Sequence, residues 1–297
     1  MSTVTASVPA ASRVGVAPPP RRRRRFDFLA FGLGLWSILV YAFLFVPIGF
    51  VVAHSFTNAN SFLLWGGFTT RWYTRLWENE PLKQAIKNSL VAATGSTIVA
   101  VVLGGFAGVA LARRGGGWVK PFLAMVFLIL VTPEIVDAIG YLIWFVRLGG
   151  PLDNGYVRLW IGHSVFSSAV VTLIVRARLS GLDESLEEAA ADLGATPARA
   201  FRQITLPLIA PALLAGGLLA FTFSLDNTIV SQFVSVAGKT TFPVYVFSSV
   251  RQVMKPDVGA AATLMLLLTL VALAIVALVL RRSGDSSSDV AATLAGG

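Results

Sequence analysis

Three acidic side chains lie in stretches of sequence that are otherwise strongly apolar: Glu134, Asp137 and Asp226. An ionised carboxylate at membrane depth costs on the order of 2.5 to 3.5 kcal/mol on insertion scales, so such acids usually face a cavity or a partner. At about 100° per residue, Glu134, Tyr141 and Phe145 fall on one side of a helix, with Asp137 about 60° away. One helix face would therefore offer two carboxylates and two aromatic rings.

Such a face suits an organic cation with methylene spacers, because carboxylates neutralise ammonium groups and ring faces add roughly 0.5 to 2 kcal/mol of cation–π attraction. The alternative is that these acids pair with Lys or Arg of a second subunit, or lie in the outer headgroup region. Asp226 and Asn227 lie in another apolar stretch that is polar beyond its midpoint. A lipid-facing helix would not tolerate that polarity, so this helix either lines the pathway or packs at a subunit seam.

The composition predicts a membrane protein: 55% of the residues are hydrophobic, 13% are charged, and the mean hydropathy is +0.74. This chain is too apolar for a soluble surface. Stretches close to the roughly 20 residues that cross a bilayer occur at six places. They are residues 29–52, 89–112, 118–142, 159–175, 213–234 and 260–280. We therefore predict an all-α polytopic protein with six transmembrane helices.

Basic residues orient these spans. Six crossings place both termini on one side of the membrane. Four basic sites then fall on that same side: the arginine run at 21–25, Arg113, Arg114 and the pair at 281–282. The positive-inside rule makes that side cytoplasmic. We expect disordered cytoplasmic tails at 1–25 and 283–297, a retained first transmembrane helix at 26–53, an external loop at 54–88 and a core of five helices at 89–282. In the loop, Trp65, Trp72, Tyr73 and Trp77 suit the headgroup level; a docking surface for an external partner is the alternative.

Several functional classes are excluded or disfavoured. The net charge of +9 does not indicate nucleic-acid binding, because the basic residues flank membrane spans, where orientation and anionic lipid explain them. The chain has no cysteine and no clustered histidines, so we predict no metal site, and we interpret His163 as a hydrogen-bonded packing residue. Gly238-Lys239-Thr240 lacks the earlier glycine of a phosphate loop, and hydrolase motifs are absent. We predict a transport protein that is not an enzyme.

A polar, helix-forming segment at 176–211 interrupts the apolar pattern on the cytoplasmic side. Its first part, 180–193, carries an apolar stripe, and Gly194 supplies a stop at a position that needs positive φ. Thr196 and Pro197 then suit the first turn of a second short helix, which Pro207 would end. The pattern predicts a helix, a tight turn and a helix: a stiff docking surface.

This segment resembles the EAA loop of ABC-transporter permeases, whose pattern is Glu-Ala-Ala, three residues, Gly, nine residues, then Ile, one residue and Leu-Pro. Every position is matched: Glu188, Ala189, Ala190, Gly194, Ile204, Leu206 and Pro207. The resemblance extends over about 80–282. Runs at 133–136, 163–166 and 221–227 are similar to the second permease of the spermidine/putrescine branch, although Asn227 stands where that branch often has a second acid.

The resemblance implies a type I ABC importer permease fold in the plasma membrane, paired with a homologous permease, most simply as a heterodimer. It also implies two ATPase subunits, which bind ATP and Mg in place of this chain, and an external solute-binding protein. The ATPase-coupling residues would be the matched positions together with Glu187, Asp192 and Phe201. The cargo would be a polyamine or a similar small cation. The alternatives are another small solute or, less favoured, an ion-coupled secondary transporter.

Overall fold

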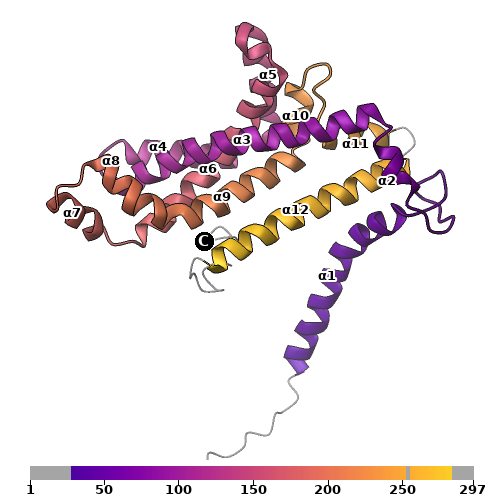
Figure 1. Cartoon of the computed structure of the whole chain (residues 1–297), viewed down its shortest axis with the longest axis horizontal. Helices are drawn as coiled ribbons and strands as arrows, with labels where there is room; N and C mark the ends of the chain where they lie inside the picture. The colour runs from indigo at the N-terminus through magenta and orange to yellow at the C-terminus, as the bar shows by residue number, and fades with distance from the viewer. Residues whose placement is uncertain (1–27, 252–254, 283–297) are drawn as a thin grey trace, which may run out of the picture. The chain divides into compact units, whose positions relative to one another are not determined.

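The computed structural model describes residues 28–251 and 255–282, so the predicted tails at 1–25 and 283–297 lie outside the described residues. The described residues form helices and short connections (Figure 1). In chain order they are α1 (Phe28–His54), α2 (Arg71–Leu76), α3 (Glu80–Arg113), α4 (Val119–Val131), α5 (Glu134–Leu148), the 3₁₀ turn η1 (Gly150–Asp153), α6 (Gly155–Ser180), α7 (Ser185–Asp192), α8 (Pro197–Ala200), the π-helical turn η2 (Phe201–Thr205), α9 (Leu206–Asp226), α10 (Ile229–Val234), α11 (Phe242–Val250) and α12 (Pro256–Arg282).

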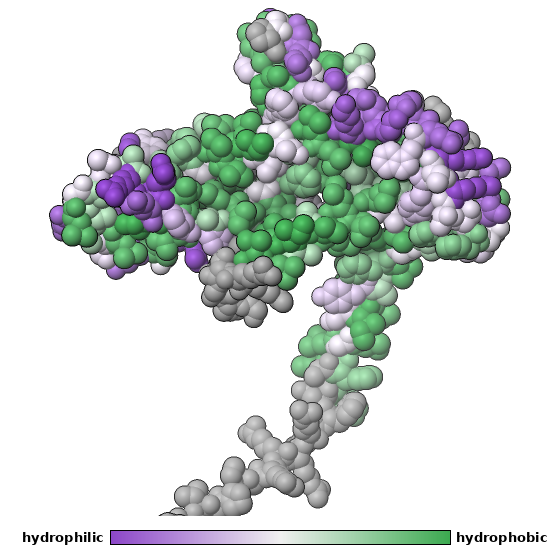
Figure 2. Space-filling model, in the orientation of Figure 1, coloured by the Kyte–Doolittle hydropathy of each residue, from purple (hydrophilic) through white to green (hydrophobic). Residues whose placement is uncertain are grey.

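The chain divides into two compact units. The first ends at Pro47 and contains most of α1, whose side chains are apolar and exposed, as suits a helix that faces lipid. The second begins at Ile48 and contains the other helices. Within the second unit, hydrophilic residues gather over α7 and α8 at one end and around α2 at the other, with apolar surface between them (Figure 2). This pattern fits a body that crosses a bilayer.

Among the described residues, five helices are long and apolar enough to cross a membrane, which confirms most of the predicted spans. The third span differs: 118–142 is not one straight helix, because α4 and α5 meet at a bend of 103°. Thr132 adopts extended backbone there, with ψ of 131°, as the residue before a proline prefers, and Pro133 lacks the N–H that would continue the helix. Counted as one broken span, the pair brings the total to six.

The fifth span also differs from the prediction of 213–234. The helix runs from Pro197 through η2 and α9 to Asp226, and α10 is a separate short helix after the break at 227–228. Pro207 therefore does not end the preceding helix. In the π turn before it, the Leu206 N–H bonds to the Phe201 carbonyl five residues back, and this wider turn accommodates the proline.

Small residues set the packing of α3, α6 and α9, which lie along one another. A Cβ added to Gly104 of α3 would lie 2.6 Å from the Ser168 carbonyl oxygen, and one added to Gly108 would lie 2.7 Å from the Val175 Cβ. The backbones of α3 and α6 can approach this closely only with glycine at these positions. These two glycines therefore lie at the contact between α3 and α6.

The segment before α3 is more ordered than a simple loop. The predicted external loop to residue 88 ends at Asn79, whose side chain accepts the Leu82 N–H and caps α3. Trp72 does not belong to an exposed aromatic belt: it is buried, and its indole N–H donates to the Thr57 carbonyl at 2.6 Å. Trp65 and Trp77 are exposed, as expected of residues at the headgroup level.

Candidate functional site

The two helix breaks, at 132–133 and 227–228, border one cavity of about 500 Å³. Its walls come from α5, α6, α9, α10 and the residues of the two breaks. The lining residues are Thr132, Glu134, Asp137, Tyr141, Gly162, His163, Phe166, Ser167, Phe223, Asp226, Asn227, Thr228, Ile229 and Val230. Three of these described lining residues are acids and none is Lys or Arg, so the cavity favours positive charge.

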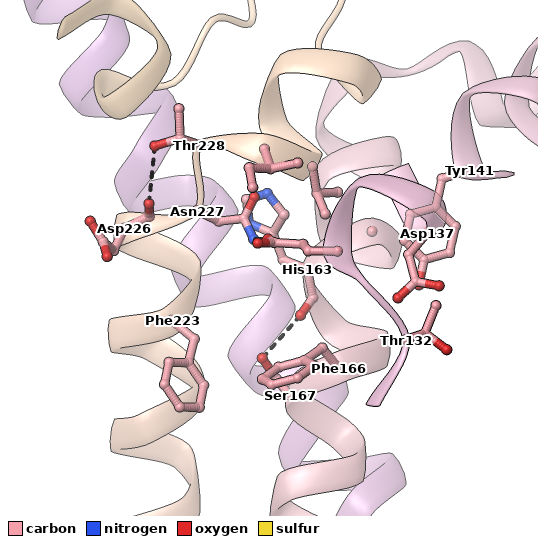
Figure 3. Close-up of a pocket in the computed structure, with 14 residues that line it drawn as sticks. Thr132, Asp137, Tyr141, His163, Phe166, Ser167, Phe223, Asp226, Asn227 and Thr228 are labelled. Carbon is pink, nitrogen blue, oxygen red and sulfur yellow. Dashed lines mark hydrogen bonds between the residues drawn. The ribbon is translucent and has the colours of Figure 1, made fainter. Parts of the chain in front are cut away.

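The acids lie on opposite sides of this cavity. In Figure 3, Asp137 and Tyr141 of α5 lie on one side and Asp226, at the end of α9, lies on the other. The rings of Phe166 and Phe223 contact each other edge to face, with centroids 5.7 Å apart. Asp226 ends a helix of 21 residues, whose carboxyl end carries partial negative charge that adds to the carboxylate.

Asn227 connects the two breaks. Its side-chain Nδ2 donates to Glu134 Oε1 at 2.5 Å, and its side-chain Oδ1 accepts the Ser231 N–H at 3.1 Å. The first residue of α5 is thus tied to the first turn of α10. An acid at position 227 could not donate this hydrogen bond and would repel Glu134. The departure of this chain from the polyamine-permease pattern therefore has a structural role.

His163 of α6 bridges the helix break at 227–228. Its Nδ1 lies 2.6 Å from Ser224 Oγ of α9, and its Nε2 lies 3.0 Å from Ser231 Oγ of α10. All three side chains are buried. The prediction of a hydrogen-bonded packing residue is therefore confirmed, and the structure adds that His163 also lines the cavity.

Replacing His163 with leucine leaves two buried serine hydroxyls without this partner, at about 1 to 3 kcal/mol for each group that stays unsatisfied. We expect thermal unfolding of the detergent-solubilised protein to begin about 4 °C lower or more. Ser164→Ala is the matched control, because that hydroxyl donates only to the Ile161 carbonyl of its own helix. Adding Ser224→Ala and Ser231→Ala to the leucine variant recovers part of the loss; an unchanged transition in the leucine variant would contradict the bridge.

The structure brings together five of the six residues predicted for the substrate pathway. They are Glu134, Asp137, Tyr141, Asp226 and Asn227. Phe145 lies outside the cavity: it is fully buried in a cluster with Leu159 and Val234, and its ring lies 5.5 Å from the Arg158 guanidinium carbon. Helical periodicity placed Phe145 on the correct face, but one turn too far along α5. Whether the other five contact cargo stays a prediction.

Sequence reasoning missed the cavity wall that α6 contributes. His163, Phe166 and Ser167 lie within one turn of that helix and all line the cavity. The i, i+3, i+4 spacing of a histidine, an aromatic ring and a hydroxyl within an apolar stretch was the available signal. Thr132 had no such signal, because it lies at the bend between α4 and α5.

The predicted coupling segment folds as a helix, a tight turn and a helix. Gly194 ends α7 with φ of 79°, the Gly194 N–H bonds to the Ala191 carbonyl, and the Ala195 N–H bonds to the Ala190 carbonyl, both at 2.9 Å. This is the hydrogen-bond pattern of a glycine helix stop. The first helix begins at Ser185, later than predicted, since residue 180 still belongs to α6. Hydrogen bonds from Ser185 hold the pKa of the Asp183 carboxyl below its usual range.

The ten residues predicted to couple this segment to an ATPase divide by exposure. The exposed members are Glu188, Ala189, Asp192, Gly194 and Pro207. The half-buried members are Glu187, Ala190, Phe201, Ile204 and Leu206. Leu193, which was not among them, is the most exposed apolar side chain of the segment at 89%. The exposed set forms part of the protein surface, and the half-buried set packs against neighbouring residues. That these residues contact an ATPase stays a prediction.

Comparison with known proteins defines the class. The sequence profile of the binding-protein-dependent transport system inner membrane component family matches residues 100–285, and the chain belongs to this family. It is a permease of the ABC-transporter type, all-α and membrane-spanning, as the coupling motif and the fold predicted.

Individual relatives are similar over most of the chain. The putrescine transport system permease protein PotI of Escherichia coli (strain K12) is 40% identical over 242 residues, which cover 78% of this chain and 85% of PotI. The spermidine/putrescine transport system permease protein PotC of the same strain is 39% identical, with 80% and 89% covered. A crystal structure of a bacterial ABC transporter involved in the import of the acidic polysaccharide alginate shares the fold, with a TM-score of 0.70 at 17% identity over 86% of this chain and 96% of that one.

Proposed function

We propose that this chain is a permease subunit of an ATP-driven importer of polyamines, and that the cargo passes the cavity between α5, α6, α9 and α10. The relatives named for putrescine and spermidine transport support the cargo class. The fold alone does not, because a transporter of an acidic polysaccharide shares it. The cargo must therefore be argued from the side chains.

The arrangement of acids in the cavity is the observation that carries this proposal. A diamine or triamine has ammonium groups separated by methylenes. Asp137 on one side and Asp226 on the other offer a carboxylate to each end of such a molecule (Figure 3). The rings of Tyr141, Phe166 and Phe223 offer apolar surface to the methylenes and cation–π attraction to the ammonium groups.

The partners follow from the family to which the chain belongs. An external solute-binding protein would deliver the cargo, and a homologous second permease would complete the pathway. Two ATPase subunits would bind ATP and Mg and dock on the exposed surface of α7, with both termini of this chain on the same cytoplasmic side. Closure of the ATPases would then switch the cavity between the two sides of the membrane.

Uptake into proteoliposomes tests the proposal. The complete complex is reconstituted with its binding protein, and entry of labelled putrescine or spermidine is measured with and without ATP. 1,4-Butanediol, which has the length of putrescine but no charge, is the control solute. We expect uptake of the amines that depends on ATP and no ATP-dependent uptake of the diol, which also crosses the bilayer without a transporter. ATP-dependent entry of the diol equal to that of the amines would reject the cationic cargo. Uptake driven by an ion gradient without ATP would indicate the secondary transporter instead.

A further inference from the structure

One of the two adjacent glutamates in the coupling segment points into the protein. Glu187 Oε1 accepts a hydrogen bond from Arg113 Nε of α3 at 3.2 Å and another from the Thr205 hydroxyl of η2 at 2.8 Å. The side chains of Arg113 and Glu187 are 13% and 29% exposed, and Thr205 is buried. Glu188, the next residue, is exposed. The two glutamates therefore have different roles.

Arg113 and Thr205 belong to two transmembrane helices that the coupling segment must move. Arg113 is the last residue of α3, and Thr205 directly precedes α9. A second contact joins the same two elements, because the Phe106 ring of α3 stacks on Phe201 of η2 with centroids 6.1 Å apart. Glu187 thus ties α7 to both helices on their predicted cytoplasmic side.

The helix that contains Thr205 ends at the cavity. The helix from Pro197 to Asp226 is continuous over 30 residues, or about 45 Å at 1.5 Å per residue. Asp226 at its far end lines the cavity. A displacement of α7 that carries Thr205 with it therefore reaches Asp226 through one continuous helix, provided that α7 and the start of this helix move together.

We propose that Arg113, Glu187 and Thr205 form a clamp that makes α7 and the cytoplasmic ends of α3 and α9 move as one body. Glu187 is then a positioning residue, rather than part of the surface that meets the ATPase. A charge-assisted hydrogen bond between partly buried groups resists sliding better than an exposed pair does. The inference rests on the ATP-driven part of the proposed function, but not on the identity of the cargo.

The test measures coupling in the assembled complex, as solute transported per ATP hydrolysed and as stimulation of ATPase activity by the loaded binding protein. Arg113→Gln and Glu187→Gln are each expected to lower both quantities by about fivefold or more. The charge-exchanged pair Arg113→Glu with Glu187→Arg is expected to recover part of each loss, because it restores the ion pair but not the bond from the Thr205 hydroxyl, for which arginine has no acceptor.

The chain offers matched controls for each substitution. Arg114 is the exposed neighbour of Arg113, so Arg114→Gln removes the same charge at the next position. Glu184 also pairs with Arg113, but its side chain is 64% exposed, so Glu184→Gln should cost little. Thr205→Val removes only the hydroxyl that donates to Glu187 and serves if the charge variants fail to assemble.

The outcomes separate a clamp from simple structural support. Support alone would lower the amount of assembled complex and leave the coupling of the remaining complex unchanged. Unchanged coupling in assembled Glu187→Gln would overturn the clamp. If the charge variants do not assemble, unchanged coupling in Thr205→Val would overturn it. Equal losses in the Arg114 and Arg113 variants would also overturn it. If the cargo proposal is wrong, unmodified complex will not take up polyamines, yet stimulation of its ATPase by its own loaded binding protein still tests the clamp.

Discussion

Gly194→Val lowers ATP-driven uptake by about tenfold or more, while the protein still inserts into the membrane. Gly194 has φ of 79°, which costs a β-branched residue on the order of 1 to 3 kcal/mol. Space does not limit the substitution, because a Cβ at this position would meet nothing within 4 Å. The strain would therefore act on the turn that orients α7 toward its partner. Uptake and membrane content are measured on the same preparation of vesicles.

Two matched variants isolate the backbone effect. Gly194→Asn adds a side chain of similar size but tolerates positive φ, so we expect it to retain most of the uptake. Gly181 ends α6 on the same side of the membrane with φ of −93°, so Gly181→Ala should have little effect. Uptake by Gly194→Val that equals that of the asparagine variant would show that the turn geometry does not matter for transport.

Asp226→Asn raises the KM for a diamine by about tenfold, because the lost charge-assisted interaction is worth roughly 1.5 kcal/mol or more. The cargo supplies the control. A monoamine of equal length has only one ammonium group, which the acids on the other side of the cavity can still bind, so its KM should change less. The measurement is initial uptake at varied cargo concentration, with the binding protein saturating.

The alternative for Asp226 is a purely structural role. In that case the variant would reduce uptake of the diamine and the monoamine by the same factor, through loss of assembled transporter. An identical KM for the diamine in the variant and the unmodified protein would remove Asp226 from the substrate path. Asp137→Asn tests the opposite side of the cavity in the same assay.

Length and hydropathy were sufficient to predict the number of spans, but not where two of them break. Pro133 and the polar run at 226–228 were visible signals in the sequence. A proline alone, however, does not fix a bend, since Pro47 lies within the continuous helix α1. Thr132 and Pro133 permit the bend of 103°, but the contacts of α5 with α10 and α6 join parts of the chain that no local pattern connects.

The same limit applies to the site. The 3.6-residue period gave the correct face of α5 for Glu134 and Tyr141, but could not show that Phe145 lies beyond the cavity. The predicted coupling set contained both Glu188, which matches the motif, and its neighbour Glu187, although only Glu187 faces inward. Its partner Arg113 is 74 residues earlier in the chain, so no local pattern distinguishes the two glutamates.

Access to the cavity tests the central claim, that closure of the ATPases switches this site between the two sides of the membrane. The chain has no cysteine, so Thr132→Cys places a unique thiol of this subunit in the cavity. A membrane-impermeant maleimide is added from outside to a complex whose other subunits lack reactive cysteines. The rate at which it labels this thiol is measured in two states: without nucleotide, and after trapping with ATP and vanadate. We predict labelling rates that differ by about tenfold or more between the two states. Equal rates in both states would contradict the account.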